Sequence, residues 1–159
     1  MSDDIVELIR AEHERIGNLF AALQSEAGLG PGSLRPCWEE VTELLQVHIA
    51  AAEEIGYPAV LTSVTDSVQR RADLMADHED ILDAVYTARF HPVASAGWWL
   101  AVGAAHVTAA HHAEQDEATI VRPLYALVTQ PDRESLGRQW RAFGVAYTLD
   151  AGQRLRDRA

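Results

Sequence analysis

The chain has 159 residues and a formal charge of −11, because 24 acidic side chains outnumber 13 basic ones, all of them arginine. This length suits one domain whose single core buries roughly two thirds of the surface of the unfolded chain. The acidic balance excludes functions that need a basic patch, so we expect the protein to bind neither nucleic acid nor an anionic membrane surface.

The cysteine content and the N-terminal sequence favour a cytoplasmic protein. Cys37 is the only cysteine and cannot form an internal disulfide. The first ten residues, MSDDIVELIR, are acidic where a secretory signal is basic and then apolar. The stretch from Val93 to Ala110 lacks formal charge but contains His106 and runs into HHAEQDE, so we expect a buried helix and no membrane span.

Capping and breaking signals predict the first two helices. Ser2 and Asp3 begin a helix that ends at Gly28, and its apolar residues recur every three or four positions. Ser33 caps a second helix, which we expect to end at Pro58 because proline lacks the backbone N–H that a helix interior needs.

Three further helices follow, over about residues 66–89, 97–128 and 132–154, with Pro123 expected to bend the second of them. No stretch shows the alternation of an exposed strand. The predicted fold class is therefore all-α: an antiparallel four-helix bundle over about residues 3–128 with an additional C-terminal helix, in one domain over residues 1–159. The four tryptophans are expected to pack in the core.

The sequence contains a weak internal repeat. AEHERI, which begins at Ala11, matches ADHEDI 65 residues later, and His48 with Glu53 maps onto His112 with Glu117 at an offset of 64. The first helical hairpin therefore resembles the second. Bundles whose two halves donate the same polar groups build two-metal sites in this way.

Each bundle helix places one histidine on its apolar face: His13, His48, His78 and His112. Without a common ion, each of the four buried imidazoles would need its own hydrogen-bond partners, so the pattern favours a metal site. Imidazole with carboxylate and no thiolate points first to iron. Cys37 lies eleven residues before His48, roughly 16 Å along a helix, and is not expected to be a ligand. The acidic residues that flank two of these histidines are expected to be solvated: Glu12, Glu14, Asp77 and Glu79.

The order and spacing of these motifs resemble the hemerythrin, or HHE cation-binding, family. The resemblance rests on His13, on HIAAAEEIGYP from His48, on ADHEDI around His78 and on HHAEQDEATIVRP from His111. The two histidine spacings, 35 and 34 residues, are nearly equal. The resemblance implies two non-haem iron ions bridged by carboxylates, and reversible binding or sensing of O2, or handling of NO or peroxide.

The second helix departs from the family pattern. The family places a carboxylate four residues after the helix-2 histidine, where this chain has Ala52, and Glu53 follows one residue later. Glu53 is therefore about 140° round an ideal helix from His48. It reaches the site if a π-bulge absorbs the extra residue or if the metal lies between two helix faces.

The fourth helix offers alternative ligands. By periodicity His112 and Asp116 face the core and His111 points away, whereas the internal repeat favours Glu117. We therefore expect His112 to be a ligand and keep both Asp116 and Glu117 as candidates for the acid.

The third helix supplies only one histidine, because Leu74 and Met75 stand where a second could precede His78. One ligand is missing, which leaves an open position, a different donor or incomplete metal loading. Tyr57 could supply a phenolate, although packing at the helix end is the favoured interpretation. His106 lies roughly 9 Å along the helix from His112 and suits a supporting or core role.

The candidate metal ligands are thus His13, His48, Glu53, His78, His112, Asp116 and Glu117. The predicted function is a non-haem di-iron protein that binds O2 or handles NO or peroxide. The alternative is a helical binding or structural bundle in which the site is degenerate, absent, or mononuclear with zinc or iron held by three histidines and one acid. Iron stoichiometry separates these hypotheses.

Overall fold

The computed structural model describes residues 3–61 and 67–156, and all regular structure in these ranges is helical. This confirms the predicted all-α bundle with an additional C-terminal helix. The elements in chain order are α1 (Ile5–Ser25), α2 (Pro31–Ala51), the π-helical segment η1 (Ala52–Gly56), α3 (Tyr57–Leu61), α4 (Ser67–Ala88), α5 (Ala96–Asp116), the π-helical segment η2 (Glu117–Val121), α6 (Arg122–Leu127) and α7 (Gln130–Arg156).

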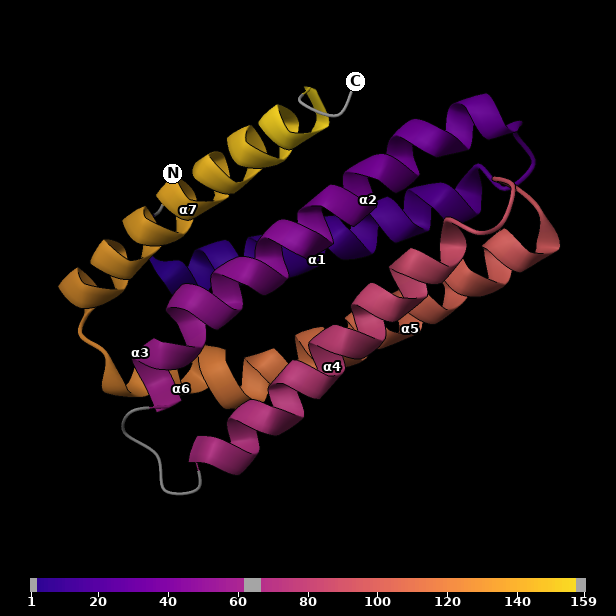
Figure 1. Cartoon of the computed structure of the whole chain (residues 1–159). Helices are drawn as coiled ribbons and strands as arrows, with labels where there is room; N and C mark the ends of the chain where they lie inside the picture. The colour runs from indigo at the N-terminus through magenta and orange to yellow at the C-terminus, as the bar shows by residue number, and fades with distance from the viewer. Residues whose placement is uncertain (1–2, 62–66, 157–159) are drawn as a thin grey trace.

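Two helical hairpins form the bundle, α1 with α2 and α4 with α5, and α7 lies along the outside of α1 and α2 (Figure 1). Helix α1 begins where the Asp4 side chain accepts a hydrogen bond of 2.9 Å from the Val6 N–H, which satisfies a backbone donor at the helix start. Among the described residues, we find no helix long and apolar enough to cross a membrane.

The core consists of two apolar clusters. One contains Phe20, Trp38 and Trp98, and the other contains Tyr57 and Trp140. In α1 and α4 the histidine falls between a residue of one cluster and a residue of the other: His13 between Ile9 and Ile16, and His78 between Leu74 and Ile81. The polar groups are thus enclosed by apolar side chains on both sides, and the burial of these three tryptophans confirms their predicted core packing.

The predicted helix end at Pro58 is wrong, since the helix continues through η1 and α3 to Leu61. In η1 the Tyr57 N–H bonds to the Ala52 carbonyl, five residues back, and Arg122 bonds to Glu117 in the same way in η2. A proline in an ideal α-helix clashes with the carbonyl four residues before it. The wider π turn immediately before Pro58 and Pro123 provides the space that each ring needs. The predicted connection over residues 61–67 lies mostly outside the described residues.

Helix α7 is held closely against the start of α1. A Cβ atom added to Gly137 would overlap the backbone carbonyl of Asp3, so only glycine fits at this contact. The Arg133 Nε atom donates to Asp4 Oδ2 at 2.8 Å, and both side chains are largely buried. The backbone contact and the ion pair together fix the position of α7 on the bundle.

This contact predicts opposite effects of alanine at two glycines of α7. Gly137→Ala should lower the free energy of unfolding by about 1–3 kcal/mol, because the added methyl group overpacks the contact with Asp3. Gly144→Ala is the matched control, since its Cβ would lie at an ordinary 3.5 Å from Val47 Cγ1. Its gain in helix propensity is up to about 1 kcal/mol. Urea unfolding of the two metal-free variants measures the difference, and equal stabilities would contradict the packing described.

Candidate metal centre

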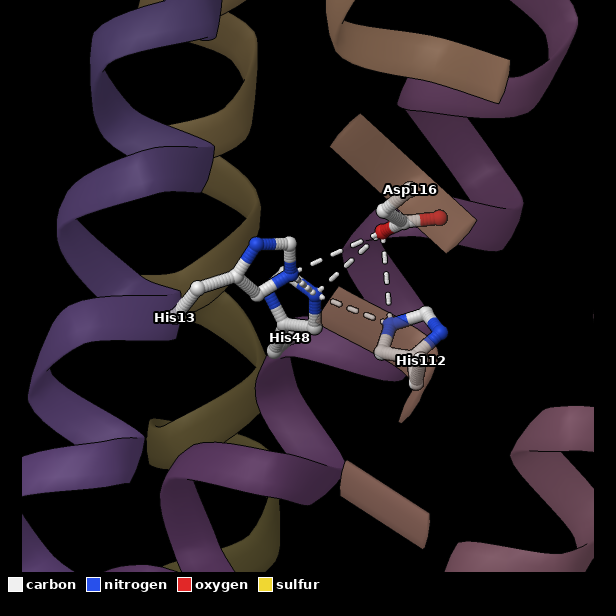
Figure 2. Close-up of side chains that lie close together, drawn as sticks. All are labelled: His13, His48, His112 and Asp116. Carbon is white, nitrogen blue, oxygen red and sulfur yellow. Dashed lines mark hydrogen bonds and ion pairs between the residues drawn. The ribbon is translucent and has the colours of Figure 1, made fainter. Parts of the chain in front are cut away.

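Three histidines and one aspartate converge from three helices, as Figure 2 shows. His13 comes from α1, His48 from α2, and His112 and Asp116 from α5. One ligand atom of each of these four residues lies within 4.8 Å of the others. The Nε2 atom of His48 is 3.0 Å from that of His13 and 3.4 Å from that of His112. All three rings therefore direct the same nitrogen to one point.

Asp116 completes this cluster because it lies four residues after His112, on the same face of α5. Its Oδ2 atom is 3.6, 3.7 and 3.3 Å from the Nε2 atoms of His13, His48 and His112. Burial opposes ionisation of this carboxyl, but the close imidazoles of His13, His48 and His112 outweigh burial and hold its pKa well below the usual range. The cluster therefore has a permanent negative charge inside the bundle.

Two of the imidazoles are neutral, the form that binds metals. Burial lowers the pKa of His112 to about 3 and also lowers the pKa of His13. The buried Nδ1 atom of His112 has no hydrogen-bond partner among the described residues. These two rings present lone pairs that protons do not occupy at neutral pH.

His48 behaves differently because two carboxylates face it. Burial alone would lower the pKa of this ring, but hydrogen bonds to Asp116 and Glu12 raise it to about 9. Its Nδ1 atom lies 2.8 Å from Glu12 Oε2. A proton on His48 thus supplies positive charge at the point where the cluster would hold a cation. Three imidazoles and one carboxylate form a donor set for a transition metal ion.

This donor set lies inside the region that a known family model matches. The hemerythrin HHE cation-binding domain matches residues 4–122, which is most of the chain. The chain belongs to the hemerythrin HHE family. Neither the comparison with curated proteins nor the comparison with solved structures gives a match.

A second polar group lies beside the first in this hemerythrin-family bundle. The Tyr57 hydroxyl is 2.8 Å from His78 Nε2 and 3.4 Å from Asp116 Oδ1, and His78 Nδ1 is 2.8 Å from Glu53 Oε1. Burial and the charge of Asp116 raise the pKa of Tyr57, so the phenol keeps its proton in the metal-free protein. A packing role was predicted for Tyr57, and its position one turn after Glu53 was the only signal of a polar role.

The other two predicted acids lie away from the three-histidine cluster. Helix α2 does continue into a π segment, as the extra residue before Glu53 requires, but the Glu53 carboxylate contacts His78 Nδ1. Glu117 accepts two hydrogen bonds from the Arg10 guanidinium, at 2.8 and 3.0 Å, which lower the pKa of this carboxyl. Of the two candidate acids on the fourth helix, Asp116 is the one that faces the histidines.

A small cavity adjoins the cluster between α1 and α5. It has a volume of about 50 Å³, and His13 and His112 form part of its wall. The remaining wall is mainly apolar, with Gly17, Phe20 and Ala109 among its residues. The cavity is large enough to hold a small molecule next to two candidate ligands.

The geometry predicts different effects of two neutralising substitutions on α5. Asp116→Asn should weaken the binding of ferrous iron by roughly 10-fold or more, because it removes the carboxylate among the imidazoles. Loss of a residue that only supports a metal ligand typically weakens binding by roughly 10-fold. Glu117→Gln should leave iron affinity unchanged and cost at most about 1 kcal/mol of stability, since it breaks only a largely exposed ion pair. Anaerobic titration with ferrous iron and urea unfolding measure both effects. A greater loss of iron affinity in Glu117→Gln would reverse this assignment.

The raised pKa of His48 predicts an alkaline loss of stability in the metal-free protein. Folding raises this pKa from 6.5 to about 9, so between these values the folded chain binds more protons at this site than the unfolded chain. The contribution of His48 to stability is complete below pH 6.5 and disappears as the pH rises through about 9. Urea midpoints between these pH values should fall in the wild type and fall less in Glu12→Gln, which lacks one of the two carboxylates. If the urea midpoints of the wild type and Glu12→Gln fall equally with pH, His48 does not make this contribution to stability.

Proposed function

We propose that this protein holds two non-haem iron ions and uses them to bind O2, NO or peroxide. The observation that carries the proposal is the position of Asp116 between two sets of donors. Its Oδ2 atom faces the three-histidine cluster, while its Oδ1 atom is 3.4 Å from the Tyr57 hydroxyl, which in turn contacts His78. One oxygen directed to each set is the arrangement that a bridging carboxylate needs.

The donor types support iron. The two sets contain imidazole, carboxylate and phenol, a combination that suits an ion able to exist as ferrous and ferric iron. Cys37 takes no part, because its thiol lies against the Leu19 carbonyl in the apolar core. Iron would supply electrons and an open coordination position for the small ligand. We also propose a cytoplasmic location, supported by the single cysteine, which needs no oxidising compartment.

The residues of this chain would each perform a definite task at such a centre. His13 and His112 border the small cavity, so a ligand entering there would lie beside the ion that they hold. The apolar clusters on both sides would exclude bulk water. Glu53 accepts the Nδ1 proton of His78, which leaves the Nε2 lone pair of that ring directed to the centre.

A mononuclear site is the second candidate. Its support is that His13, His48, His112 and Asp116 by themselves provide four ligand atoms within 4.8 Å, enough for one four-coordinate zinc or iron ion. In that case Tyr57 and His78 would form a supporting hydrogen-bond group.

Metal content of a His78→Gln variant separates the two candidates. With two ions, the wild type should contain near two irons per chain and the variant near one, because His78 belongs to the second set only. With one ion, both should contain near one. The absorption spectrum before and after anaerobic reduction and exposure to O2, NO or peroxide then tests the ligand chemistry. Wild-type protein that contains no iron after expression in iron-supplemented medium would refute the proposal.

A further inference from the structure

Glu12 joins a candidate metal ligand to the C-terminal helix. One carboxylate oxygen, Oε2, lies 2.8 Å from His48 Nδ1, and the other, Oε1, accepts a hydrogen bond of 2.9 Å from the Trp140 indole N–H. Trp140 is 3% exposed and belongs to α7, which begins after the residues that the family model matches. A residue outside the matched region is therefore linked by hydrogen bonds to a candidate metal ligand, with Glu12 between them.

The donor and acceptor roles in this chain are fixed by chemistry. An indole N–H can only donate, and an ionised carboxylate can only accept. Glu12 can therefore satisfy both neighbours only when His48 carries a proton on Nδ1. In the neutral ring that binds a metal, Nε2 is then the nitrogen with the available lone pair, and this atom faces the other two histidines.

We propose that Trp140 is a positioning residue of the metal centre: its N–H holds Glu12 in the orientation that keeps the proton of His48 on Nδ1 and its Nε2 atom directed to the metal. This inference rests on the proposed function in that it assigns a metal to the cluster. On this proposal, α7 contributes a residue that orients a metal ligand.

The packing around Trp140 leaves the indole little freedom to move. Its ring stands edge to face against the His48 ring, with centroids 5.6 Å apart. Its Cζ3 atom lies 3.5 Å from the point where a Cβ of Gly56 would be, so the indole covers the π turn after His48. The contacts of Gly137 and Arg133 with the start of α1 fix the helix that carries Trp140. Glu12 therefore meets a donor of fixed position.

Glu12→Gln tests this arrangement because an amide cannot accept from both neighbours. Its single oxygen has to face the Trp140 N–H, which turns the amide NH2 toward His48 Nδ1. A protonated Nδ1 would then meet another donor, so the proton moves to Nε2 and blocks that ligand. We expect Co(II), a probe for ferrous iron, to bind this variant up to about 100-fold more weakly than the wild type.

The double variant Glu12→Gln with Trp140→Phe gives the decisive comparison. Without the indole N–H, the amide is free to turn its oxygen to His48 Nδ1, so Co(II) affinity should recover toward the wild-type value. Trp140→Phe alone should weaken Co(II) binding about 10-fold. Trp99→Phe is the matched control and should leave affinity unchanged, because Trp99 packs on Trp98, away from the histidines. If Trp140 has only a structural role, the double variant should bind Co(II) no more tightly than Glu12→Gln does. That result would overturn the proposal.

A metal-free measurement separates this inference from the proposed function. At an alkaline pH where the ring is neutral, ring 15N NMR shows which nitrogen of the His48 imidazole carries the proton. We expect Nδ1 in the wild type, Nε2 in Glu12→Gln and Nδ1 in the double variant. A wild type that binds neither iron nor Co(II) but shows this pattern would refute the metal centre and keep the positioning role. A proton on Nε2 in the wild type, or no change in Glu12→Gln, would refute the positioning role whatever the metal content.

Discussion

The burial of one negative charge is the constraint on which this bundle depends. Asp116 is 1% exposed, and an isolated carboxylate at that depth would be strongly destabilising unless positive charge or hydrogen-bond donors surround it. The Tyr57 hydroxyl donates to it, and the imidazoles of His13 and His48 lie beside it, on α1, on α2 and on the helix that continues α2. The helices α1, α2 with its continuation, and α5 must therefore stay in register for the charge to be tolerated, and the apolar clusters on either side keep water from relieving that requirement.

The two π-helical segments adapt the second half of each hairpin to this requirement. Each begins a few residues after an inward histidine and ends just before a proline. The extra residue in each turn changes which side chains face inward beyond that point. In α2 the consequence is that Tyr57, one residue before Pro58, is fully buried and contacts His78, while Glu53 reaches the same ring from the other side.

Helical periodicity was sufficient to predict the four helices, their inward histidines and the orientation of Asp116, because all of these depend on spacing within one helix. The partners of the remaining acids depend on contacts between distant parts of the chain. Glu117 pairs with Arg10 across 107 residues, and Glu12 meets Trp140 across 128. Glu12 sits beside an inward histidine, where a charged residue is normally solvated, so periodicity alone does not place it at the centre. The continuation past Pro58 was missed because a π turn has no sequence signature as clear as proline itself.

The size of the cavity beside His13 and His112 has a consequence for how such a centre would be supplied with electrons. A space of about 50 Å³ suits a small ligand and is far below the roughly 300 Å³ or more of pockets that hold organic cofactors. The ligand and the electrons would therefore arrive by separate routes, the first through the gap between α1 and α5 and the second through the surrounding protein. The size of the cavity would then determine which ligand reaches the centre, and the packed side chains would separately determine the rate at which electrons reach it.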